Sequence, residues 1–124
     1  MAHDDLNPAD LDDLVSMIRD GGDVECSLDP VDLNGVGVWV SLTAIRGDRL
    51  QGTTLEVTLF LIAPDGPPST VLRMLADCYN LVRPRIAGLP RNGVVQSVRV
   101  TIPGVEGRPM PALSIPVLLH TVNE

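Results

Sequence analysis

The sequence has 124 residues, 44% of them hydrophobic, with one Trp, one Tyr and one Phe, so Val, Leu and Ile must build the core. Its formal net charge of -7 argues against a protein that grips nucleic-acid phosphates through a basic surface. The length predicts a single domain over residues 1–124, and no apolar run approaches the roughly 20 residues of a membrane span.

The first predicted element is a helix, preceded by a flexible tail over residues 1–6. Asn7 can cap this helix and Pro8 suits its first position, while Gly21 and Gly22 end it. An apolar stripe at helical spacing lies between these limits. The stripe consists of Leu11, Leu14, Val15 and Ile18.

Alternating apolar residues predict three strands after this helix, over residues 23–28, 36–43 and 53–63. Within the third, the stretch 55–62 is aliphatic at every odd position. Its even positions begin polar and turn apolar, which indicates that the far end is covered on both faces. We therefore expect this strand at the centre of the sheet. The polar connection 46–52 predicts a long hairpin with a protruding loop.

The second half of the chain predicts one helix and two strands. Apolar residues at helical spacing favour a helix over 69–82, which Ser69 or Asp65 could cap and Pro84 must end or kink. The stripe consists of Val71, Leu72, Leu75, Tyr79 and Val82. Strands are expected over 94–102 and 113–119. Pro116 cannot donate to a ladder, so the last strand should be an edge or carry a bulge.

These elements predict an α+β fold of two layers, in the order α-β-β-β-α-β-β. Hairpins are the short route between neighbouring strands, so we expect a mostly antiparallel five-stranded sheet. The two amphipathic helices should cover one face of it.

Residues that carry chemistry are sparse, and we expect no enzyme, cofactor or metal site. A nucleophilic triad would need His120, which we expect to be a partly exposed structural residue at a strand end. Cys26 and Cys78 fall at positions expected to be buried, which favours free thiols and leaves a disulfide between them open.

The two long loops, over residues 46–52 and 103–111, are the predicted assembly interface, because long loops often carry function and the stiffening of the second loop by proline lowers the entropy lost on docking. The exposed edge of a sheet also favours pairing with another copy of the chain. The expected interface residues are Arg46, Asp48, Arg49, Gln51, Glu106, Arg108 and Met110.

The chain resembles the tail terminator and tail-completion proteins of long-tailed phages. The stretches that carry the likeness are DLDDLV (10–15), GVWVSL (37–42), RGDR (46–49), TVLRMLAD (70–77) and PALSIPVL (111–118). Together they cover nearly the whole chain. The lysine-free, Val-rich composition is similar to that of phages of actinobacteria.

The resemblance implies a virion protein, assembled in the host cytoplasm, that forms a hexameric ring on the tail tube. Its partners would be other copies, the major tail tube protein and the head-tail connector or neck proteins. An acidic lumen would let genome DNA pass without specific binding, and no membrane would be involved. A connector or stopper of the neck is an alternative, and an acidic dimeric secretion chaperone is an alternative from another class.

Overall fold

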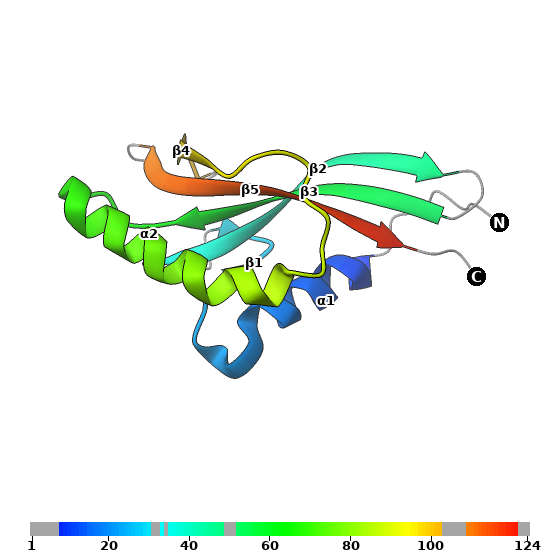
Figure 1. Cartoon of the computed structure of the whole chain (residues 1–124), viewed down its shortest axis with the longest axis horizontal. Helices are drawn as coiled ribbons and strands as arrows, with labels where there is room; N and C mark the ends of the chain where they lie inside the picture. Colours follow the sequence, from blue (N-terminus) through cyan, green and yellow to red (C-terminus); the bar gives the residue numbers. More distant parts are fainter. Residues whose placement is uncertain (1–7, 31–32, 34, 49–51, 103–108, 122–124) are drawn as a thin grey trace.

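The computed structural model describes residues 8–30, 33, 35–48, 52–102 and 109–121, and the predicted tail over 1–6 lies outside this part. Figure 1 shows two layers, with a sheet above and both α-helices below it. The elements are α1 (Pro8–Arg19), η1 (Asp20–Gly22), β1 (Cys26–Ser27), β2 (Gly37–Asp48), β3 (Gly52–Ile62), α2 (Pro68–Val82), η3 (Arg83–Ile86), β4 (Gln96–Val100) and β5 (Met110–Thr121). The α+β class, the five strands and the two α-helices are confirmed, while η1 and η3 interrupt the predicted order.

The sheet has the strand order β1-β2-β3-β5-β4, so the predicted central strand does lie at its centre. All neighbouring pairs are antiparallel except β1 and β2, where Cys26 pairs with Val38 in parallel. The sheet is therefore mixed. A parallel pair requires a connection that returns the chain to the end from which the first strand started, which a tight hairpin turn does not do.

The main core fills the space between the helices and one face of the sheet. All four residues of the predicted α1 stripe are buried, and the odd positions of β3 from Leu55 to Leu61 are at most 1% exposed. Burying a Leu or Val side chain contributes roughly 1.5–3 kcal/mol. This aliphatic layer therefore holds the two-layer fold together.

The stripe of α2 departs from the prediction at one position. Val71, Leu75 and Val82 are buried together with Cys78, whereas Leu72 is 68% exposed. A helix buries one stripe at i, i+4, i+7 spacing, and Leu72 lies beside that stripe on the outer surface. The helix also begins one residue early, after Pro67, and no side chain caps it.

The prediction that β5 is an edge strand is wrong at Pro116. This residue pairs with Thr58 of β3, and its carbonyl accepts a hydrogen bond from the Asn92 amide at 3.0 Å on the other side. Within a strand, the nitrogen and carbonyl of one residue point to the same side. The missing donor of Pro116 therefore faces the 87–95 connector and takes no hydrogen bond from the pairing with β3.

Candidate functional site

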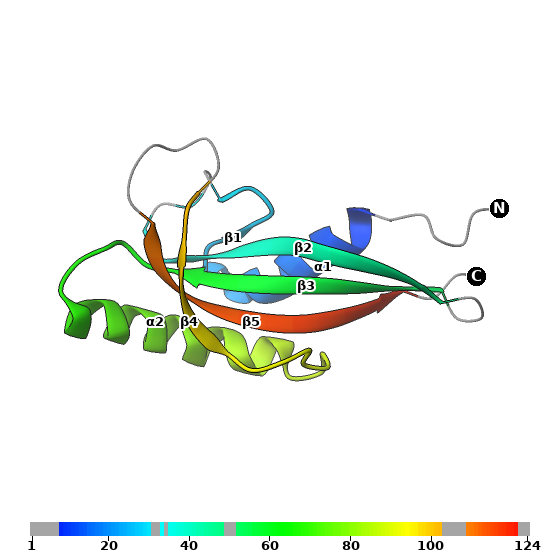
Figure 2. The same cartoon turned by 90° about the horizontal axis from the view of Figure 1, so that it is seen from above.

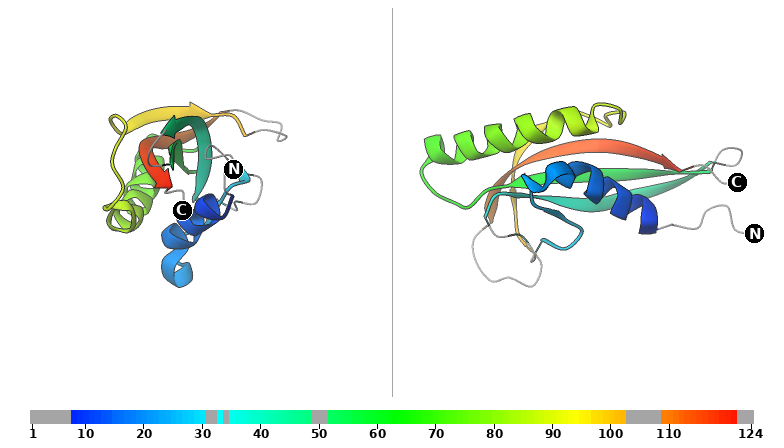
Figure 3. Two further views of the ribbon diagram at one scale, coloured as in Figure 1. Left: turned by 90° about the vertical axis from the view of Figure 1, so that its right-hand side faces the viewer. Right: turned by 90° about the horizontal axis from the view of Figure 1, so that it is seen from below.

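Neither helix covers the upper face of the sheet (Figures 1 and 3). Strand alternation directs Phe60 and Ile62 of β3 to this face, opposite the core-facing odd positions, and they belong to a small second apolar cluster. Ile62, Val100 and Ala112 are buried there. Partly buried residues surround them, namely Trp39, Phe60, Val98 and Met110. The rings of Trp39 and Phe60 lie 5.2 Å apart between centroids at 32°. This cluster explains why β3 becomes apolar on both faces toward Ile62.

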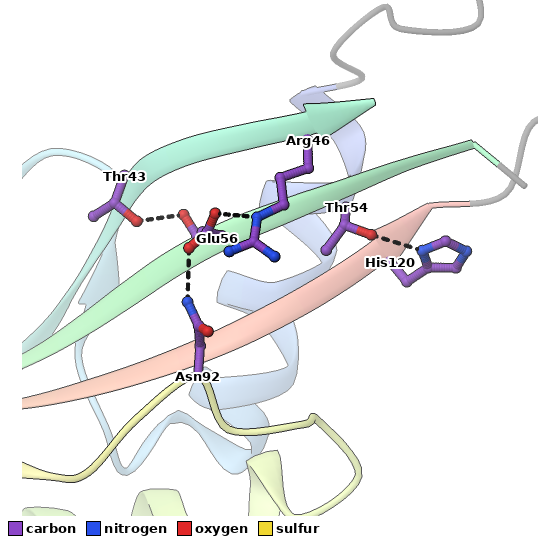
Figure 4. A network of polar contacts seen from close by, with 6 residues as sticks. All are labelled: Thr43, Arg46, Thr54, Glu56, Asn92 and His120. Atoms are coloured by element: carbon purple, nitrogen blue, oxygen red, sulfur yellow. Dashed lines mark hydrogen bonds and ion pairs between the residues drawn. The ribbon is translucent and has the colours of Figure 1, made fainter. Parts of the chain in front are cut away.

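A polar network centred on Glu56 occupies the other end of the same face (Figure 4). The Glu56 carboxylate accepts a hydrogen bond from Arg46 Nε at 2.6 Å and another from Asn92 Nδ2 at 2.7 Å. The Glu56 side chain is only 17% exposed, while that of Arg46 is 63% exposed. One carboxylate thus joins β2, β3 and the connector that precedes β4.

The connector over residues 87–95 is held against β5 by backbone hydrogen bonds as well. The Asn92 amide donates to Pro116, and the Leu118 amide donates to the Pro90 carbonyl at 2.9 Å. Arg91, between these anchors, is exposed, and Val94 and Val95, which follow them, are 68% and 38% exposed. We call Arg91, Val94 and Val95 the connector tip.

The paired ends of β2 and β3 form a tongue that runs past the N-terminal end of α1 (Figures 1 and 3). A register shift between Leu42 and Ala44 leaves one extra residue, Thr43, whose hydroxyl donates to the Glu56 carbonyl at 2.7 Å. Residues 43–46 are exposed, including Ile45 at 45%. Beyond Trp39, no strand of the described chain pairs with the outer edge of β2.

The prediction of a loop over residues 46–52 is wrong for its two ends, because the β2–β3 hairpin includes them. Arg46 and Asp48 lie in β2, where they pair with Thr54 and Gly52 of β3, because ladder pairing continues almost to the turn. Met110 opens β5 and packs on the second apolar cluster. The predicted interface residues Arg49, Gln51, Glu106 and Arg108 lie outside the described residues.

Glu56 and Asn92 were missed by sequence reasoning, although one signal was present. Glu56 is a lone acid in a strand that is otherwise apolar or hydroxylated, and such a residue needs a partner when it is mostly covered. Its partner Asn92 is 36 positions away, so no spacing rule could identify it.

A shallow groove of about 280 Å³ lies on the helix side of the molecule, between α2 and residues 22–25. Its lining combines apolar side chains with carboxylates and includes no basic residue. We call it the acidic groove and define it by Val24, Val36 and Met74 together with Asp23, Glu25 and Asp77. Asp23 already accepts two hydrogen bonds from Arg85, at 2.7 and 2.9 Å.

The two cysteines are free and buried, as predicted. Burial raises the pKa of the Cys26 thiol to about 12 and the pKa of the Cys78 thiol to about 11. Both are therefore protonated at neutral pH and poor nucleophiles. His120 is exposed and its Nδ1 lies 3.0 Å from the Thr54 hydroxyl, which agrees with the structural role expected for it.

Comparisons with protein-family models, with curated proteins and with solved structures found no significant match. Within the described ranges, His, Cys, Asp and Glu do not gather in a group that could hold a metal ion. The helices of this part of the chain are also too short or too polar to cross a membrane.

Proposed function

We propose that this protein is a structural part of a phage tail. Copies of it form a hexameric ring that caps the tail tube, ends its polymerisation and joins it to the neck. The observation that carries the proposal is the β2–β3 tongue, which projects past the helices and whose outer edge on β2, beyond Trp39, pairs with no other strand of the described residues.

The tongue has the chemistry of a protein contact. Free N–H and C=O groups on a strand edge pair readily with another chain, and proteins with no such partner usually protect the edge. Residues 43–46 add an exposed aliphatic side chain at Ile45 and a guanidinium at Arg46. In the proposed role, this edge docks on the last ring of tube protein.

The net charge suits the same role. A chain with formal charge -7 repels DNA phosphates, so a ring built from it lets the genome slide through without binding. The other face of the ring would meet the head-tail connector or another neck protein.

The experiment that tests this function shortens the tongue without touching the core. An Asn-Gly turn replaces residues 47–53, so that it connects the paired residues Arg46 and Thr54. We expect a folded chain that no longer stops tube growth, so that virions complemented with it carry tails of uncontrolled length. Gly66→Ala, in open space between β3 and α2, is the matched control.

Two other outcomes separate the alternatives. Tails of normal length that fail to join heads would assign the chain to a connector or stopper role in the neck. Normal virions from the shortened chain would refute the function proposed for the tongue.

A further inference from the structure

The distribution of charge along the chain is strongly uneven. Residues 78–102 contain Arg83, Arg85, Arg91 and Arg99 and no acidic residue, although the whole chain carries 16 acids and 9 bases. The connector tip lies within this basic stretch. Figures 2 and 3 show α1 and α2 on one side of the sheet, and the acidic groove lies on this helix side, between α2 and residues 22–25.

The connector tip and the acidic groove are complementary in two respects. The tip presents exposed aliphatic side chains from Val94 and Val95 beside a guanidinium that has no ion-pair partner among the described residues. The groove presents an apolar floor beside carboxylates. Opposite charges at the rim of an apolar contact favour one partner and one orientation.

One carboxylate at the rim of the groove already binds a guanidinium from this basic stretch within the same molecule. Arg85 holds Asp23 through a two-pronged contact on one rim, while Asp77 lies exposed on the α2 side. The tip itself is well ordered for docking, because the Asn92–Glu56 hydrogen bond and the Pro90 and Asn92 backbone bonds fix the connector on the sheet. A preformed tip loses little entropy on binding.

We infer that the connector tip of one copy docks in the acidic groove of the next, with Arg91 facing Asp77. The contact is heterologous, because it joins two different surfaces of the chain. Repetition of such a contact produces a closed ring or an open filament, depending on the rotation between copies. The inference rests on the proposed ring and names the contact between its subunits.

Two substitutions at exposed positions test the contact from its two sides. Val94→Asp replaces the apolar tip with a charge that the groove repels, and Asp77→Arg places a base opposite Arg91. Sedimentation of the wild-type full chain at increasing concentration should show association. Each variant should raise the dissociation constant at least about tenfold, as loss of a central contact does. Asp12→Arg, a charge reversal on the exposed surface of α1 away from the groove, should leave it unchanged.

A mixture of the two variants tests directly whether the tip of one chain binds the groove of another. The Asp77→Arg chain keeps an intact tip and the Val94→Asp chain keeps an intact groove, so an equimolar mixture should associate more tightly than either variant does alone. A monomeric mixture, a wild-type chain that never associates, or association that neither substitution weakens would overturn the inference. Circular dichroism of each variant verifies that it is folded.

Failure of this contact can be told apart from failure of the proposed function. A chain that caps tubes although Val94→Asp leaves its association unchanged would overturn the contact alone. A chain whose association depends on both surfaces but that does not cap tubes would overturn the function alone.

Discussion

Glu56 in β3 and Asn92 in the connector are joined by a hydrogen bond of 2.7 Å. The bond ties the connector to the upper face of the sheet, in addition to the backbone hydrogen bonds that the connector makes with β5. It therefore links the central strand to the exposed connector tip. The same carboxylate also binds Arg46 in the tongue, so one residue connects both proposed contact surfaces.

Removal of the Glu56 carboxylate should mainly weaken the attachment of the connector to the sheet. Glu56→Ala should lower the free energy of unfolding by about 1–3 kcal/mol, because Asn92 loses a charge-assisted partner. Arg46→Ala should cost at most ~1 kcal/mol, since this guanidinium is largely exposed and solvent screens the pair. Urea unfolding of both variants measures the difference. An equal loss in both would show that the Arg46 pair, and not the Asn92 bond, is the important one.

Two leucines, Leu59 and Leu72, test the aliphatic layer. The sequence places both on a predicted apolar face, but the structure buries only Leu59. Leu59 is fully buried in β3, and truncation to Ala should cost roughly 2–5 kcal/mol because it removes apolar contacts and leaves a cavity. Leu72→Ala in α2 should change stability by about 0.5 kcal/mol or less. Thermal unfolding distinguishes them, and a large loss from Leu72→Ala would contradict the observed orientation of α2.

The Arg85 side chain ties η3 to the end of α1. Its guanidinium donates to the Ile18 carbonyl at 2.8 Å and to both Asp23 oxygens. Lysine cannot reproduce this planar fork. Arg85→Lys should therefore lower stability by about 1–2 kcal/mol, as loss of charge-assisted hydrogen bonds does. The exposed Arg73→Lys change is the control, and equal stability of the two variants would refute a specific role of the fork.

Alkaline pH should destabilise the fold through the two thiols. The pKa of each is raised by burial from an ordinary value of 9.0, so the folded state favours the protonated form. The corresponding stability is complete below pH 9 and is lost as the pH rises toward 11 and 12, because the unfolded chain releases these protons first. Urea midpoints between pH 8 and 11 measure the loss.

A Cys26→Ala, Cys78→Ala double variant is the control for that measurement. It should be less stable at pH 7, owing to lost packing, but show a flatter decline above pH 9. An unchanged slope would assign the alkaline loss to other groups. Slow alkylation of the native thiols at pH 8, accelerated by urea, would agree with their burial.

Local periodicity was sufficient to predict the elements and the main core. The stripe of α1 and the alternation of β3 each define one apolar face, and burying that face is the largest favourable contribution to folding. The ending of α2 before Pro84 and the burial of the two thiols follow from equally local properties. These features need no knowledge of which segment lies opposite.

The sequence by itself determined the α+β class, the helix and strand positions and the central place of β3, because these depend on spacing between near neighbours. Only the tertiary structure decided the parallel pairing of β1, the exposure of Leu72, the interior place of Pro116 and the meeting of Glu56 with Asn92. Each of those depends on which distant segment packs alongside, and that choice is made by the whole core at once rather than by any local run of residues.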